Sequence, residues 1–211
     1  MIAALGRDLA GLGSFLARNA RLVVIAAATA AVLLRAPSTA FGERYLGALV
    51  YFGVVPLVIG LCLGRDPRKL GLTIGSPRAW LPLTLLYMVV ACAVLLATRA
   101  SLGLEDYRPS VSAGPLCALV ELSIFMIGWE FLFRGFLLFG LREQMGEAAV
   151  LLQMVPFVLV HASARTPETA AGIVSGIYFG YVCHKGGSFL PAVLMHTAAS
   201  YLNVALSRGY L

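Results

Sequence analysis

The chain has 211 residues, of which 60% are hydrophobic and only 12% charged, and its mean hydropathy is +0.88. Soluble domains usually have about half apolar and about a quarter charged residues, so this composition excludes an ordinary water-soluble globule. The formal net charge of +6 is scattered between apolar blocks, which argues against nucleic-acid binding and favours contact with membrane lipid headgroups.

Seven apolar segments are candidates for membrane spans. A helix needs about 20 mainly apolar residues to cross the hydrocarbon core. In chain order, the predicted spans are residues 21–35, 45–63, 80–98, 114–140, 148–164, 169–184 and 188–207. The segment from Leu5 to Leu16 has leucines at helical spacing and is expected to lie along the membrane interface. The sequence predicts an all-α, polytopic transmembrane bundle of about 6–8 spans, forming one integral membrane domain over residues 1–211.

The first span resembles a signal peptide but is predicted to stay in the protein. Arg18 and Arg21 precede it, and Ser38-Thr39-Ala40 looks like a small-residue cleavage site. However, the basic segment before the span is long, and Arg35 closes the apolar run before that site. With seven spans, nine basic residues lie on the N-terminal side and six on the other, which favours a cytoplasmic N-terminus in a bacterial inner membrane.

Two charges lie inside the fourth predicted span. Glu130 and Arg134 are four residues apart, so on a helix they share one face and can pair. An ionisable group at bilayer depth costs about 2.5–3.5 kcal/mol, and such groups usually face a protein interior and serve function. The alternative is an ion pair that only fixes helix packing, although desolvation leaves such pairs little net stability.

Two histidines lie in similar apolar surroundings on later spans. His161 ends the run Pro156-Phe157-Val158-Leu159-Val160, and His196 follows a second proline-led run. A single histidine in such a run is typical of a packing residue, whereas two beside a Glu/Arg helix indicate a polar site. Ser200 and Asn203 lie four and seven residues after His196 and share its helix face.

Glu168 has two interpretations. Thr166-Pro167-Glu168 has the pattern of a helix start, with a capping residue, a proline and an acid in the first turn. The functional alternative is a second carboxylate over the site.

The four cysteines have no CxxC spacing and are expected to be buried apolar groups rather than a disulfide or zinc framework.

The motifs Glu130-x-x-x-Arg134 and Phe157-x-x-x-His161, followed by His196 on a late helix, resemble those of a known family. This is the type II CAAX prenyl endopeptidase and bacteriocin-processing (CPBP) family of intramembrane glutamic proteases. The resemblance covers about residues 115–205 as the catalytic core. It implies that a glutamate and a histidine activate water, while a second histidine and an asparagine stabilise the oxyanion.

The chain departs from the family pattern at two positions. Trp129 stands where the family has its first, catalytic glutamate, and Ser200 stands where it has the asparagine. Either this is a variant branch that uses Glu130, or activity is lost. The form Trp-Glu-Phe-x-Phe-Arg-Gly resembles the myxosortase-type branch, which is linked to C-terminal sorting signals of exported proteins.

The expected activity is therefore hydrolysis of a peptide bond in a membrane-anchored or exported protein substrate. Hydrolysis without a nucleophilic side chain needs a base for water, donors for the oxyanion and an acid for the leaving amine. Glu130 is expected to be the base and Arg134 to orient it. His161 is expected to hold or deprotonate the water, and Glu168 to be a supporting acid. His196, with Ser200 or Asn203, is expected to face the oxyanion. No cofactor or metal is expected.

Two other classes of function stay open. Glu130, His161 and His196 resemble a His₂Glu zinc set of a zinc-dependent membrane protease, although the HExxH helix is missing. A non-catalytic membrane scaffold or transporter is favoured by Trp129, but neither a repeat nor a pair of broken helices supports a transporter.

Overall fold

The computed structural model describes residues 11, 14, 19–35, 45–98, 111–112, 114–161 and 166–210, except the side chains of residues 21, 35 and 166–169. The regular elements of this part are all helical, with no strand. They are α2 (Ala20–Arg35), α4 (Tyr45–Ala48), η1 (Leu49–Val54), α5 (Val55–Cys62), η2 (Pro67–Leu70), α6 (Pro77–Thr98), α7 (Pro115–Glu130), η4 (Phe131–Leu137), α8 (Leu138–Met145), α9 (Ala148–His161), α10 (Thr166–Gly186) and α11 (Leu190–Arg208). The predicted all-α bundle is confirmed.

Each predicted span coincides with a helix or a continuous helical stretch. Three stretches are long and apolar enough to cross a membrane, namely Tyr45–Cys62, Pro77–Thr98 and Pro115–Met145. Leu22–Leu34 and Ala148–His161 are shorter apolar helices. The last two predicted spans are α10 and α11, which are less apolar, so the total number of spans stays a prediction. The interfacial segment before α2 and the proposed cleavage site after it lie outside the described residues.

Prolines and glycines set the helix ends. Pro115 begins α7 directly after Gly114, whose backbone is extended, because a proline is best tolerated in the first helical turn. Gly146 ends α8 with φ +55°, and Gly209 ends α11 with φ +66°. The fourth span extends beyond its predicted end at residue 140, since α7, η4 and α8 follow one another without a break.

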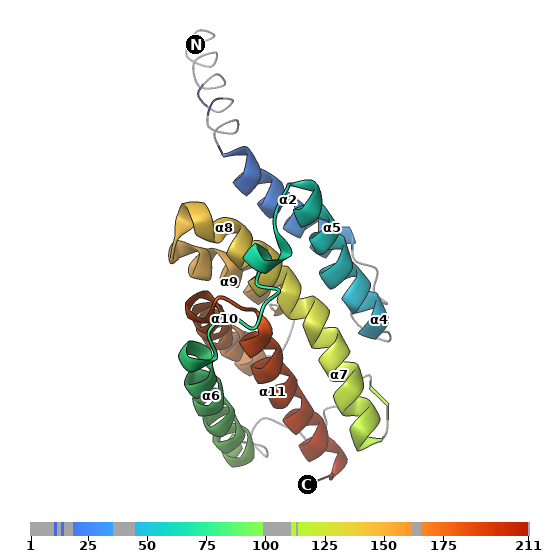
Figure 1. The fold of residues 1–211 in the computed structure, drawn as a ribbon. Helices are drawn as coiled ribbons and strands as arrows, with labels where there is room; N and C mark the ends of the chain where they lie inside the picture. The colour runs from blue at the N-terminus through green and yellow to red at the C-terminus, as the bar shows by residue number, and fades with distance from the viewer. Residues whose placement is uncertain are drawn as a thin grey trace, which may run out of the picture.

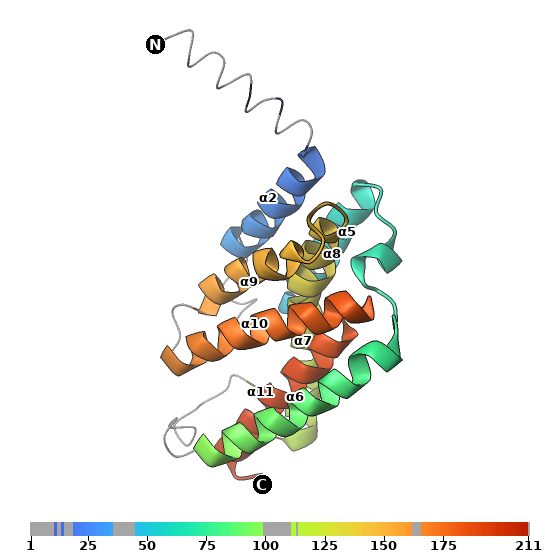
Figure 2. The same ribbon diagram turned by 90° about the vertical axis from the view of Figure 1, so that its left-hand side faces the viewer.

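The α7–η4 stretch lies in the middle of the bundle (Figure 1). It packs against α11 on one side and against α4 and η1 on the other. Figure 2 shows α9 and α10 side by side, with α6 on the other flank of α10. Residues of α7, η4, α9, α10 and α11 can therefore meet in one interior space.

A loop before α6 fixes the turn between α10 and α11. The Ser76 backbone N–H donates to the Gly186 carbonyl over 2.8 Å, and the Ser188 hydroxyl donates to the Thr73 carbonyl over 2.5 Å. Gly75 has φ +63°, and a Cβ there would lie 2.1 Å from the Gly186 oxygen, so only glycine fits. This loop holds the start of α11 and thereby sets the position of His196.

Basic side chains gather at the end of the bundle where α5 leads to α6. Arg65 in this connection pairs with Glu143 of α8 over 2.6 Å. Nearby in the sequence, Glu147 in the turn after α8 pairs with Lys185 of α10 over 3.2 Å. Basic residues concentrate on the cytoplasmic side of membrane proteins. The cytoplasmic placement of this end stays a prediction.

A glycine allows α7 to approach η1 closely. A Cβ on Gly128 would lie 2.5 Å from the Ala48 carbonyl oxygen and 2.8 Å from the Leu49 Cα, both backbone atoms. We expect Gly128→Ala to lower the free energy of unfolding by about 1–3 kcal/mol, because the helices must move apart. Thermal unfolding in detergent measures this loss. Gly53→Ala is the matched control, since its Cβ would meet Gly128 at an ordinary 3.4 Å. Equal losses in both variants would contradict the prediction.

Candidate active site

Glu130 and Arg134 lie in the fully buried centre of the bundle. Glu130 is the last residue of α7, and Arg134 lies in the π-helical stretch η4 that follows. Both side chains have 0% exposure. π-Helical turns inside longer helices often mark functional sites. The predicted pair forms, with 2.8 Å between the Arg134 Nη1 and the Glu130 Oε2 atoms.

Arg134 is held by aromatic faces as well as by Glu130. Its guanidinium carbon lies 4.0 Å from the centroid of the Phe157 ring and 5.5 Å from that of Phe179. Aromatic rings attract cations, and the attraction grows where water is excluded. Arg134 is fully buried, so its guanidinium faces Glu130 and these rings rather than a surface open to a substrate.

His196 contacts the second oxygen of Glu130. Its Nδ1 atom lies 2.5 Å from the Glu130 Oε1 atom, across 66 positions of sequence. A charged carboxylate only accepts hydrogen bonds, so Nδ1 carries the proton and Nε2 is the free ring nitrogen. A carboxylate placed in this way fixes the tautomer and orientation of an imidazole.

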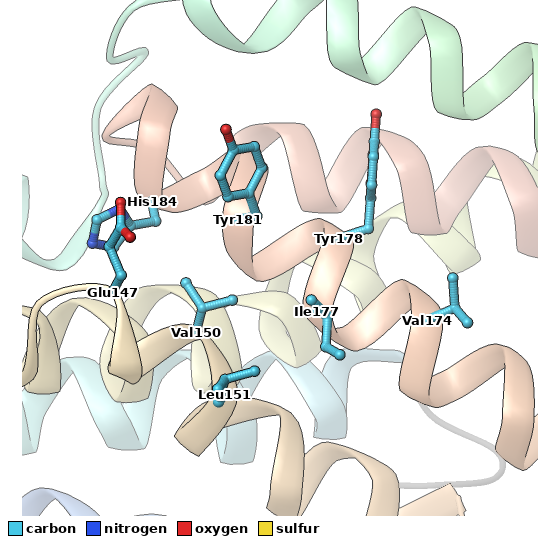
Figure 3. A pocket seen from close by; sticks show the side chains of 8 residues that line it. All are labelled: Glu147, Val150, Leu151, Val174, Ile177, Tyr178, Tyr181 and His184. Carbon is cyan, nitrogen blue, oxygen red and sulfur yellow. The ribbon is translucent and has the colours of Figure 1, made fainter.

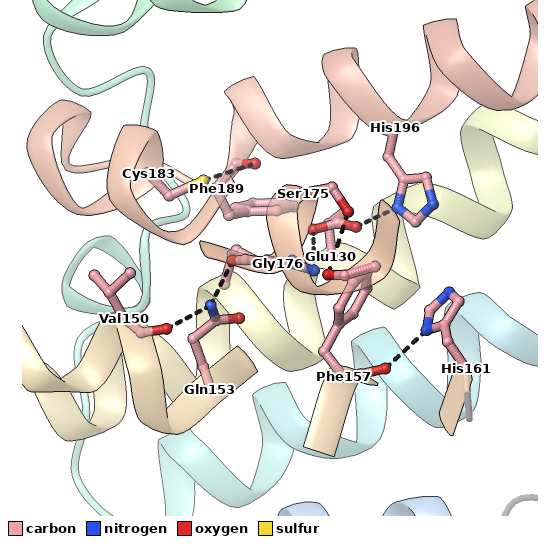
Figure 4. Close-up of polar contacts among 12 residues, drawn as sticks. Glu130, Val150, Gln153, Phe157, His161, Ser175, Gly176, Cys183, Phe189 and His196 are labelled. Carbon is pink, nitrogen blue, oxygen red and sulfur yellow. Dashed lines mark hydrogen bonds and ion pairs between the residues drawn. The ribbon is translucent and has the colours of Figure 1, made fainter. Parts of the chain in front are cut away.

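His161 is oriented in the same way by the backbone. Its Nδ1 atom lies 2.7 Å from the Phe157 carbonyl oxygen, which can only accept, so Nε2 is again the ring nitrogen left unprotonated in the neutral form. Both imidazoles pack on the Phe157 ring, with centroid distances of 4.6 Å for His161 and 6.1 Å for His196. In Figure 4 both rings lie on the same side of Glu130 and Phe157, with His196 above His161. The imidazole rings of His161 and His196 therefore border the same part of the site.

Trp129 forms an aromatic wall where the resemblance places a catalytic glutamate. The side chain is 4% exposed and packs edge-to-face on Phe52, at 5.2 Å between centroids. Its ring also lies 5.1 Å from that of Phe133 and 6.0 Å from that of His161. On α7, Glu130 is thus the one carboxylate beside the two histidines.

The supporting residues have different outcomes. Ser200 and Asn203 are half-buried on α11, and the Asn203 Oδ1 atom is enclosed without a hydrogen-bond partner. Neither side chain bonds to Glu130 or His196, so their roles stay predictions. Glu168 lies in the first turn of α10, but its side chain is outside the described residues.

In the described part, Glu130, His161 and His196 are not gathered as a three-ligand set for a metal ion, so the zinc alternative gains no geometric support.

The geometry favours an indirect role for Glu130. Both carboxylate oxygens face charged or polar partners, and the side chain has 0% exposure. To act on water directly, the carboxylate would have to leave Arg134 or His196. A carboxylate that stabilises the protonated form of His196 needs no such movement.

An aromatic residue beside the pair was missed from the sequence. The Phe179 ring lies 5.8 Å from that of His196, centroid to centroid, and 5.5 Å from the Arg134 guanidinium carbon. An aromatic residue inside an apolar helix gives no sequence signal of a site.

A hollow lined mainly by apolar side chains lies elsewhere, between α9 and α10 (Figure 3). Its volume is about 520 Å³, and its walls are mostly aliphatic and tyrosine side chains. Glu147 and His184 close one end, but no predicted site residue lines it. His184, the third histidine of the chain, is therefore remote from the Glu130 cluster and serves as a natural control.

A comparison with protein families identifies the site-bearing segment. Residues 113–202 match the family described as type II CAAX prenyl endopeptidase Rce1-like. Over this segment, which is 90 of the 211 residues, the chain is similar to that family. The matched segment contains Glu130, Arg134, His161 and His196, and the family that it resembles is one of peptidases. No curated protein and no solved structure matches it.

Proposed function

We propose that the chain is an intramembrane endopeptidase that cleaves a membrane-anchored or exported protein at a C-terminal sorting signal. The observation that carries the proposal is the 2.5 Å contact of His196 with Glu130, whose other oxygen is held by Arg134. The similarity of residues 113–202 to a peptidase family supports a peptidase, and the apolar helices support a substrate in or at the membrane.

The proposed reaction uses the Nε2 atoms of the two imidazoles. A water molecule donates one hydrogen bond to each Nε2 atom, which orients its oxygen toward the substrate carbonyl carbon. As the C–O bond forms, His196 takes the water proton, and Glu130 stabilises the resulting imidazolium. The His196 proton then passes to the leaving nitrogen, and the C–N bond breaks. Ser200 and Asn203 are proposed to donate hydrogen bonds to the oxyanion.

The three histidines test this function. A candidate exported protein with an apolar C-terminal tail is co-expressed with the wild-type chain or with one variant, and its size is followed by immunoblotting. We expect His161→Ala and His196→Ala to slow cleavage by about 10²-fold or more, as for loss of acid–base catalysis. His184→Ala is expected to cleave like the wild type. Normal cleavage by both site variants would overturn the proposal.

A non-catalytic membrane scaffold is the second candidate, and Trp129 is the observation that favours it. The family pattern has a catalytic glutamate at this position, and the chain has a buried ring. A scaffold would retain the co-expressed protein in a pull-down without producing a shorter product. His161→Ala would then leave both the retention and the size of the bound protein unchanged.

A further inference from the structure

A small cavity between α6 and α11 borders the candidate active site. Its volume is about 200 Å³. Among the residues that line it, Tyr87 and Cys92 come from α6, and Met195, Ala199 and Leu202 come from α11. The walls are almost entirely apolar, and two of the α11 residues that line the cavity, Ala198 and Ala199, are small.

The cavity is linked to the site by α11 and by a chain of ring contacts. Ala199 lies three residues after His196, so the two are neighbours on one helix face. On the opposite wall, the Tyr87 ring packs edge-to-face on Phe179 at 4.9 Å, and Phe179 lies 5.8 Å from His196. A group in the cavity would therefore lie one side chain away from the proposed base.

The Tyr87 hydroxyl is an uncommitted polar group at this cavity. Within the described part of the chain, it has no hydrogen-bond partner. Its neighbour Tyr178, stacked on it at 5.7 Å, instead donates its hydroxyl to the Leu83 carbonyl over 2.8 Å. A half-buried phenol usually has a partner. Tyr87 is therefore placed to bond to a ligand.

The size of the cavity indicates what fits. Sites for whole drug-sized ligands are about 300–1,000 Å³, whereas an apolar cavity of about 150 Å³ holds a benzene molecule. A cavity of about 200 Å³ suits one side chain of leucine or phenylalanine size. A lipid acyl chain has no acceptor for the Tyr87 hydroxyl, but a peptide has a carbonyl beside every side chain.

We propose that this cavity is the substrate subsite for one large apolar side chain next to the scissile bond, and that Tyr87 donates a hydrogen bond to a neighbouring peptide carbonyl. This inference deepens the proposed function and rests on it. The substrate class becomes a protein with a leucine-sized or phenylalanine-sized residue beside the cleaved bond. Tyr87 acts as a specificity-determining residue and Ala199 sets the depth of the subsite.

Cys92 reports on the subsite without any need for cleavage. The purified full chain in detergent is treated with N-ethylmaleimide, and the labelling rate of each cysteine is measured by peptide mass spectrometry. The probes are the N-acetyl methylamides of leucine, phenylalanine and glycine at millimolar concentration. We expect the leucine and phenylalanine probes to slow labelling of Cys92, and the glycine probe to leave it unchanged. Cys62 and Cys117 are exposed, so they are internal references whose rates stay constant.

Substitutions in the cavity complete the test. Ala199→Phe should fill the subsite and abolish protection, and Tyr87→Phe should weaken protection roughly 2- to 10-fold through the lost hydrogen bond. Tyr178→Phe should protect like the wild type, since its hydroxyl serves the Leu83 carbonyl. Equal protection by all three probes, no protection by any, or an unchanged Tyr87→Phe variant would overturn the subsite. Selective protection in a chain that cleaves nothing would overturn the proposed function and leave the subsite as a peptide-binding pocket.

Discussion

Glu130→Gln is expected to abolish cleavage and to destabilise the protein by about 3–5 kcal/mol. The substitution keeps the shape of the side chain, but it removes the charge that compensates Arg134, whose side chain has 0% exposure. A buried charge that loses its partner carries its desolvation cost uncompensated. The neutral amide also no longer stabilises a protonated His196, so the base is weakened. Cleavage of a co-expressed substrate and thermal unfolding in detergent measure the two effects.

A double variant separates catalysis from stability. Replacing the pair by apolar residues, with Glu130→Leu and Arg134→Met, removes both charges from the interior. Such replacements are often neutral or stabilising, so we expect thermal stability to return close to that of the wild type. Cleavage should remain absent, since His196 has lost the group that orients it. A stable double variant that still cleaves would show that Glu130 only fixes packing.

The helices and the ion pair could be predicted from the sequence because both depend on local patterns. Apolar runs mark the helices, and a spacing of four places Glu130 and Arg134 on one helical face. Their 2.8 Å contact needs no knowledge of any other helix. The pattern Thr166-Pro167-Glu168 marks the start of α10 for the same reason.

The contacts between helices could not be predicted in this way. The bond from His196 to Glu130 depends on the rotation of α11 against α7, and hydropathy in a bundle of apolar helices carries little information on rotation. Phe179 packs on His196, and Tyr87 packs on Phe179, because α10 and α6 turn these rings toward each other. An aromatic residue that faces the site and one that faces lipid have the same local sequence pattern.

Trp129→Glu tests whether this chain has lost a catalytic glutamate or has an aromatic residue with its own structural role. We expect the substitution to destabilise the protein by about 3–5 kcal/mol or more and not to increase cleavage. The Trp129 ring packs within 6 Å, centroid to centroid, of the rings of Phe52, Phe125 and Phe133. A carboxylate among these rings would be buried without a cationic partner, since Arg134 is already engaged by Glu130.

Trp129→Phe is the matched control, because it keeps an aromatic ring beside His161 and removes only part of the packing. It should lose less stability than Trp129→Glu and keep most of the cleavage, both measured as for Glu130→Gln. A gain of cleavage in Trp129→Glu would contradict this prediction. If Trp129→Glu folded normally and cleaved faster than the wild type, a carboxylate beside His161 would be the better base. Glu130 and Arg134 would then hold His196 in place, and the natural chain would be a weakened protease.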